Sequence, residues 1–156
     1  MADEPILSLE AFLPYRLNRL AEAVSRDFSK LYRERYGLTR PEWRVLATLG
    51  EFPTMTATEI GTHSSMHKTK VSRAVVELER HGWLTRKTDG ADRRVEHLAL
   101  TKAGRGVYRE MVPIANAFQK RLASAMSAAR FAELDYGLQR LEEFVLKDLE
   151  KVDRRG

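Results

Sequence analysis

Apolar residues recur at helical spacing in three long segments of the chain. The steps between them are 4, 3, 4, 4 and 3 in the first two segments and 3, 4, 3, 4 and 4 in the third. The three sets are Leu13, Leu17, Leu20, Val24, Phe28 and Leu31; Val107, Met111, Ile114, Phe118, Leu122 and Ala125; and Phe131, Leu134, Leu138, Leu141, Val145 and Leu149. The spacing predicts long amphipathic helices over 11–37, over 102–126 and from Ser127 onward. Such a chain is constrained to a mainly helical fold.

Two sequence signals predict a further helix near residue 40. Thr39 is followed three residues later by Glu42, the pattern of a capping box, in which each residue binds the backbone of the other. Trp43, Leu46 and Leu49 then form one apolar face, and Gly50 is expected to end the helix.

The segment from Thr56 to Gly82 predicts two helices joined by a tight turn. Thr56 and Glu59 form a second possible capping box for a helix of about two turns. The next helix has one narrow apolar face and an opposite face rich in cations. The apolar face holds Val71, Ala74, Val75 and Leu78, and the opposite face holds Lys68, Lys70, Arg73, Glu77 and Arg80.

A hairpin is predicted next. Residues 83–87 and 95–101 alternate apolar and polar positions, and the turn residues Thr-Asp-Gly-Ala-Asp lie between them. Thr101 then stands where the long fifth helix begins, as its N-cap. The predicted order is therefore four helices, a hairpin and two helices.

The positive charge is concentrated in the central part of the chain. Residues 63–94 hold eight Lys or Arg and four Asp or Glu, so this segment carries +4 of the net +5. A solvated surface would explain that excess, and so would a footprint for phosphates. The chain has no cysteine, which excludes disulfides and thiolate chemistry, and no apolar run long enough to span a bilayer. Its acidic N-terminus lacks a signal pattern, so we expect a cytoplasmic protein.

A short helix, a tight turn and a helix with a basic front is an arrangement that places the second helix in the major groove of DNA. The side chains expected to reach phosphates and base edges are Lys68, Thr69, Lys70, Ser72 and Arg73. Arg93 and Arg94 follow on the hairpin, where a guanidinium can enter the minor groove. The alternatives are an ordinary amphipathic surface helix and salt bridges from the arginines to Asp89 and Asp92.

The order of these features resembles the MarR family of bacterial transcription regulators. The segment "DRRVEHLALT" fits the family pattern Asp-x-Arg-x-x-x-Leu-x-Leu-Thr at Asp92, Arg94, Leu98, Leu100 and Thr101. "KVSRAVVELERHGWLTR" is similar to the recognition helix and first wing strand, and "YGLTRPEWRVLATLG" to the second helix. The chain departs from the family where the turn carries Ser64 and Ser65, and where His67 replaces the usual Ser or Asp cap.

The resemblance implies a winged helix-turn-helix core over 39–100 and a helical dimerisation region formed by 9–36 and 101–150. The family binds double-stranded DNA as a homodimer, with two recognition helices on a pseudo-palindromic operator. By position, Asp92 is a residue that orients Arg94 within the wing rather than a DNA contact. Sequence does not decide whether Arg93 or Arg94 contacts DNA. Long apolar stripes, more than the central unit can cover, also favour a second copy as partner; the alternative is that they cover each other within the chain.

Family members are commonly released from DNA by a small aromatic carboxylate or phenol, bound between the dimer helices and the DNA-binding lobe. The candidate ligand residues in this chain are Tyr15, Arg16, Trp43 and Arg44, where the arginines pair with a carboxylate and the aromatic rings sandwich the ligand. A core position for Trp43, and a solvated or dimer-bridging Arg16, are the alternatives.

Other classes of function have weaker support. The chain shows no glycine-rich phosphate loop, nucleophile elbow or paired acid motif, so we expect no enzyme. We also expect no cofactor and no metal. The alternative function is a packaging or architectural dimer that binds nucleic acid without sequence preference. The sequence does not determine the effector, the operator, the target genes, or whether the protein represses or activates transcription. Repression is the favoured interpretation.

Overall fold

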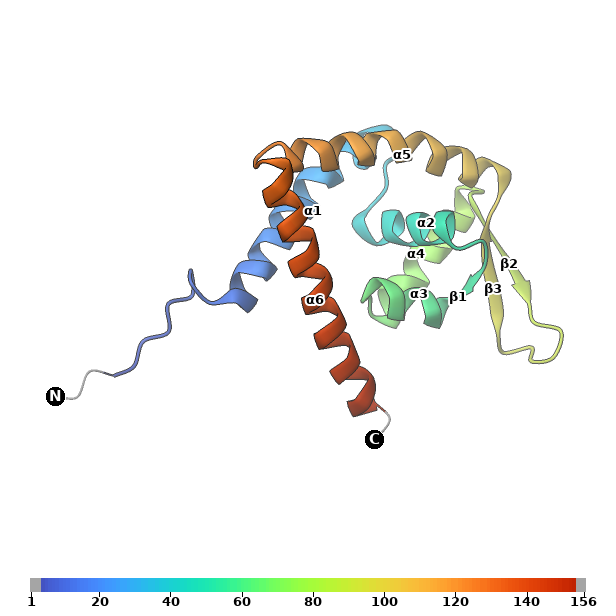
Figure 1. The fold of residues 1–156 in the computed structure, drawn as a ribbon. Helices are drawn as coiled ribbons and strands as arrows, with labels where there is room; N and C mark the ends of the chain where they lie inside the picture. The colour runs from blue at the N-terminus through green and yellow to red at the C-terminus, as the bar shows by residue number, and fades with distance from the viewer. Residues whose placement is uncertain (1–3, 154–156) are drawn as a thin grey trace. The chain divides into compact units, whose positions relative to one another are not determined.

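The computed structural model describes residues 4–153, with side chains to residue 147. It contains α1 (Leu13–Tyr36), α2 (Arg40–Glu51), β1 (Met55–Thr56), α3 (Ala57–Ser64), α4 (Lys68–Arg80), β2 (Leu84–Thr88), β3 (Glu96–Leu100), α5 (Lys102–Ala123) and α6 (Ala128–Asp153) (Figure 1). The predicted order of helices and hairpin is confirmed. The chain divides into two compact units, one running to Ile114 and one starting at Ala115.

The first unit is built around one apolar core. The core takes residues from α1, α2, α3, α4, the sheet and α5, and its most buried large side chains are Tyr32, Leu38, Leu46, Leu49, Ile60, Leu78, Leu98 and Met111. The four predicted apolar positions of α4, Val71, Ala74, Val75 and Leu78, are all buried. The spacing of apolar residues thus fixed which side of α4 faces inward and left its cationic side in solvent.

The sheet has one strand more than the sequence predicted. Its order is β1-β3-β2, and both pairs are antiparallel. Leu98 of β3 lies between Met55 of β1 and Arg86 of β2. A strand of two residues carries no alternation to detect, so β1 follows only from the pairing itself.

Local signals predicted most helix ends. Both capping boxes, Thr39 with Glu42 and Thr56 with Glu59, are present. Gly37 ends α1 in the left-handed conformation, with φ of 66°. At the start of α6, the hydroxyl of Ser127 accepts a hydrogen bond from the backbone of Arg130 at 3.3 Å. The fifth helix ends at Ala123, three residues before its predicted end at Met126.

The prediction that Gly50 ends the second helix is wrong. The helix continues to Glu51, and Gly50 lies within its last turn under the ring of Tyr108 from α5. A Cβ at this position would stand 2.2 Å from a ring carbon of Tyr108. The glycine therefore serves close packing between α2 and α5, which sequence alone does not distinguish from a helix stop.

Arg105 fastens the start of α5 to the end of α2. Its guanidinium donates hydrogen bonds to the carbonyl oxygens of Gly50 at 2.8 Å and Leu49 at 3.4 Å. Carbonyl groups in the last turn of a helix have no partner within that helix, and a cation there also complements the helix dipole. This contact was not predicted, because Arg105 is far from Leu49 and Gly50 in the sequence.

Thr101 joins three elements at the base of the hairpin. Its hydroxyl donates to the carbonyl oxygen of Gly82 at 2.7 Å and accepts from the backbone N–H of Gly104 at 3.1 Å. Its own N–H donates to the carbonyl oxygen of Trp83 at 3.0 Å. Thr101 is thus the predicted N-cap of α5, and it also holds the turn between α4 and β2.

The turn between α3 and α4 contains the one described non-glycine residue with a positive φ, Ser65 (φ 52°). Left-handed backbone costs an L-residue roughly 1 kcal/mol, and glycine avoids that cost. We expect Ser65→Gly to raise the free energy of unfolding by about 0.5–1 kcal/mol, measured by urea denaturation. The adjacent Ser64→Gly, inside α3, is the control and should lower it instead. An equal loss for both variants would show that Ser65 makes a compensating contact.

No helix among residues 4–153 is long and apolar enough to cross a membrane.

Candidate nucleic-acid interface

The cationic face of α4 is open to solvent along its length. Every residue predicted to contact DNA on this helix is exposed: Lys68, Thr69, Lys70, Ser72 and Arg73. They occupy the first two turns, opposite the buried face that fixes the helix on the core. The long cationic side chains and the short hydroxyls therefore point away from the protein, where phosphates and base edges can meet them.

The N-terminus of α4 carries no acidic cap. His67 is the N-cap, as predicted, and its Nδ1 accepts a hydrogen bond from the backbone N–H of Thr69 at 3.4 Å. The first turn contains no Asp or Glu. The partial positive charge of the helix start is therefore not neutralised by a carboxylate, which favours an approaching phosphate.

Asp89 organises the tip of the hairpin formed by β2 and β3, which is the wing. One carboxylate oxygen accepts hydrogen bonds from the backbone N–H groups of Ala91 at 2.8 Å and Asp92 at 3.0 Å. The other oxygen lies 2.7 Å from Nε2 of His97. These contacts, led by the one to His97, lower the pKa of Asp89 from 3.8 to about 2. The turn residues were predicted, but the pairing of Asp89 with His97 was not.

Protonating Asp89 is expected to loosen the wing. Because the pKa of Asp89 is lower in the folded protein than in an unfolded chain, its carboxylate stabilises the wing at pH above about 4. That stabilisation should be lost as the pH falls from about 4 towards 2. NMR titration of the Ala91 and Asp92 amide signals should show the change, and the Asp89→Asn variant should show none. A midpoint at the ordinary pKa near 4 would contradict the hydrogen-bonded geometry.

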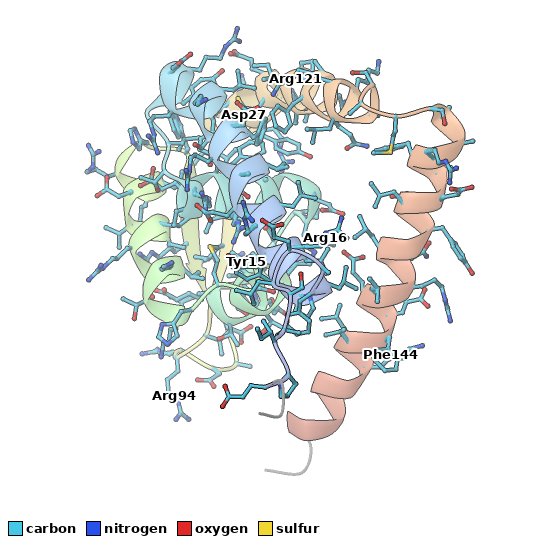
Figure 2. All side chains as sticks on the ribbon, turned by 90° about the vertical axis from the view of Figure 1, so that its left-hand side faces the viewer. Tyr15, Arg16, Asp27, Arg94, Arg121 and Phe144 are labelled. Atoms are coloured by element: carbon cyan, nitrogen blue, oxygen red, sulfur yellow. The ribbon has the colours of Figure 1, made fainter. Side chains whose placement is uncertain are left out.

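Asp92 and the two arginines follow the tip. A carboxylate oxygen of Asp92 accepts a hydrogen bond from the backbone N–H of Arg94 at 3.0 Å. The same oxygen lies 3.5 Å from Nε of the Arg94 side chain. Arg94 nevertheless keeps 93% of its side chain exposed, and Figure 2 shows it extending away from the ribbon. Arg93 is exposed as well, and within the described part of the chain its side chain has no ion pair.

A groove of about 380 Å³ separates α4 from the wing. Lys68, Ser72 and Val76 of α4 line one side, and Arg94 and Glu96 line the other. Thr56 of β1 and Thr58 of α3 also line it. Residues far apart in the sequence, predicted separately as DNA contacts, thus share one surface.

Two cations of the central segment are held by carboxylates instead. Arg86 on β2 bridges Glu79 of α4 at 3.0 Å and Glu96 of β3 at 3.1 Å. Arg80 pairs with Glu77 at 2.9 Å. The charge excess counted along the sequence therefore overstates the free cations, and Arg86 joins α4 to the wing.

The four candidate ligand residues lie apart within one chain. Trp43 packs at the edge of the core, stacked on Tyr32 with ring centroids 5.5 Å apart, and against Phe28 at 5.4 Å. Tyr15 and Arg16 are exposed near the start of α1 (Figure 2). Arg44 is half-buried on α2. Phe28 comes 13 residues after Tyr15, about 20 Å along a helix. Tyr15 and Trp43 therefore do not sandwich one ring in a single chain.

Among the side chains that the structure describes, residues 4–147, no group of three or more His, Asp or Glu is placed to hold a metal ion. His63 and His67 stand on opposite sides of the turn between α3 and α4.

Comparison with known proteins gives consistent matches. The family model described as the MarR family matches residues 36–95, which contain α2, β1, α3, α4, β2 and the turn that leads to β3. The transcriptional repressor MprA of Escherichia coli (strain K12) is 27% identical over 151 residues, covering 92% of this chain and 84% of that protein.

Solved structures agree with these matches. The MarR family transcriptional regulator SPO1453 from Silicibacter pomeroyi DSS-3 is 32% identical, with a TM-score of 0.73, covering 87% of this chain and 98% of that one. FabT of Streptococcus pneumoniae, solved in complex with DNA, is 26% identical, with a TM-score of 0.68, covering 86% and 97%.

Proposed function

Because this chain belongs to the MarR family and is a DNA-binding regulator of transcription, we propose that it represses its targets as a homodimer on a pseudo-palindromic operator. One observation carries the proposal: Lys68 and Ser72 of the exposed face of α4 and Arg94 of the wing border the same groove. The helix enters the major groove, and the wing follows the neighbouring minor groove. The name of MprA supports repression rather than activation. We place this activity in the cytoplasm.

Exposed apolar side chains on the terminal helices support the homodimer. On α1, Leu13, Leu17 and Leu20 are exposed, the last by 60%. On α6, Leu134, Leu138, Leu141 and Val145 are exposed, while the side chain of Leu149 lies outside the described residues. These residues belong to the apolar stripes predicted from the sequence for α1 and α6. A second copy would remove them from water, so residues 9–36 and 101–150 form the proposed dimerisation region.

Binding to DNA should reveal whether recognition is specific. The operator is found by selecting DNA fragments from a random pool and measuring affinity at fixed salt. We expect at least about 10³-fold preference over bulk competitor DNA and two half-sites about 34–36 Å apart. Sedimentation of the complex should give two chains per site. A steep salt dependence with no sequence preference would favour the packaging alternative and overturn the proposed regulator.

Regulation by a small aromatic carboxylate or phenol is the finer part of the proposal. Arg44 follows Trp43 on α2, and Arg16 follows Tyr15 on α1, so each helix offers one cation and one aromatic ring as a pair of candidate ligand residues. Since these pairs lie apart in one chain, a site that uses both would need the partner copy. An effector releases DNA only if it binds the free form more tightly than the bound form.

A ligand screen tests this part separately. Benzoates and phenols that raise the melting temperature of the free protein should also release the selected operator, and the operator should weaken their binding by the same factor. Arg44→Gln and Arg16→Gln identify which cation is used. If no compound acts at both steps, the effector part is wrong and the DNA-binding part stands.

A further inference from the structure

Val76 is an apolar side chain on the face of α4 that otherwise carries polar and charged groups. It is 51% exposed, whereas the other apolar residues of the helix, Val71, Ala74, Val75 and Leu78, are at most 3% exposed. Valine is also a poorer helix former than alanine. Packing within the protein therefore does not explain why this position holds a branched apolar residue.

The position of Val76 places it with the predicted DNA contacts. It follows Thr69 by seven residues, Ser72 by four and Arg73 by three, so these side chains share one side of the helix. It also lines the groove between α4 and the wing, together with Lys68, Ser72 and Arg94. A helix that lies in the major groove on this face brings Val76 to the base edges.

The apolar feature that a base pair offers in the major groove is the 5-methyl group of thymine. The other distinguishing groups there are hydrogen-bond donors and acceptors, with which an isopropyl group does not pair. A protein partner is a poorer occupant, because the neighbouring residues of this face, Arg73, Glu77 and Arg80, are charged. We propose that Val76 determines specificity by packing against the methyl group of one thymine in each half-site. This inference rests on the proposed binding of α4 in the major groove.

The test removes the methyl group from the DNA and the isopropyl group from the protein. Each thymine of the selected operator is replaced in turn by deoxyuridine, which pairs with adenine but lacks the methyl. For the full-length protein, one position in each half-site should weaken binding about 4-fold, and replacing both should weaken it about 15-fold, the effect of losing one and two buried methyl contacts.

The variant Val76→Ala should bind the unmodified operator more weakly and be insensitive to deoxyuridine at that same position. The matched control is Lys70→Ala, which removes a proposed phosphate contact on the same helix. It should weaken all operators alike and keep the 4-fold difference between thymine and deoxyuridine. Alanine favours the helix, so circular dichroism of Val76→Ala should be unchanged.

Two outcomes would overturn the inference. The first is that deoxyuridine leaves wild-type affinity unchanged at every position. The second is that it weakens binding of wild type and Val76→Ala by the same factor. Either result makes Val76 a solvated surface residue while the operator binding survives. If selection enriches no sequence at all, the proposed function fails first, and the inference fails with it.

Discussion

Replacing Gly104 with alanine is expected to lower the free energy of unfolding by about 3 kcal/mol. A Cβ at this position would stand 2.0 Å from the carbonyl oxygen of Trp83 and 2.8 Å from its carbonyl carbon. The obstacle is backbone, so it cannot rotate away. Relief requires α5 to move from the hairpin, which also breaks the hydrogen bond from the N–H of Thr101 to the same oxygen.

Gly106 supplies the matched control in the same helix. A Cβ there meets nothing within 4 Å, so Gly106→Ala should stabilise the protein by about 0.5–1 kcal/mol through helix propensity. At one fixed protein concentration, urea denaturation should give Gly106→Ala a higher free energy of unfolding than wild type and Gly104→Ala a much lower one. Thermal unfolding should show the melting temperature of Gly104→Ala lowered by about 6–12 °C. Equal behaviour of the two variants would mean that α5 does not press on Trp83.

Replacing Arg94 with alanine is expected to weaken operator binding by about 10- to 100-fold, the effect of losing one guanidinium contact to DNA. Arg94 lines the groove beside Lys68 and Ser72, and Asp92 holds its backbone and side chain. A restrained guanidinium loses less conformational freedom on binding than a mobile one. Arg93 has no such restraint among the described residues, so Arg93→Ala should have the smaller effect.

Affinity should be measured by fluorescence anisotropy over a series of salt concentrations. If Arg94 neutralises a phosphate in or beside the minor groove, the slope of log affinity against log salt should fall by about 0.9 in Arg94→Ala. Arg130→Ala is the control, since Arg130 is an exposed arginine outside the proposed winged core and already pairs with Glu133. A larger loss in Arg93→Ala than in Arg94→Ala would reverse the assignment. Asp92→Ala should fall between wild type and Arg94→Ala.

Local chemistry explains which parts of the fold could be predicted. Thr39 with Glu42 and Thr56 with Glu59 fix helix starts within four residues of sequence, and the structure contains both capping boxes. The buried face of α4 follows from apolar spacing alone. Where the deciding contact is distant in sequence, the prediction was wrong or absent. Gly50 was predicted to end a helix but packs against Tyr108, and β1 was not predicted because only its pairing with β3 defines it as a strand.

The candidate DNA-binding site also has one part that the sequence predicts and one part that it does not. Exposure of Lys68, Thr69, Lys70, Ser72 and Arg73 follows from their position opposite the apolar face. Which charged side chains are unpaired does not follow from the sequence, because their partners lie on other elements. Arg86 forms ion pairs with Glu79 and Glu96, and Asp89 contacts His97 rather than an arginine. Counting charge along the chain cannot separate paired cations from available ones.

By itself, the sequence determined the helices, the hairpin, the caps and the faces of α4, since each depends on residues a few positions apart. Tertiary structure alone decided that Gly104 and Gly50 must be glycines, that Arg105 binds the end of α2, and that Arg94 and α4 border one groove. It also left Val76 in solvent among polar neighbours. The physical reason is the sequence separation over which each interaction acts. Hydrophobic periodicity and capping involve residues a few positions apart, whereas close packing and ion pairing join segments that only the folded chain brings into contact.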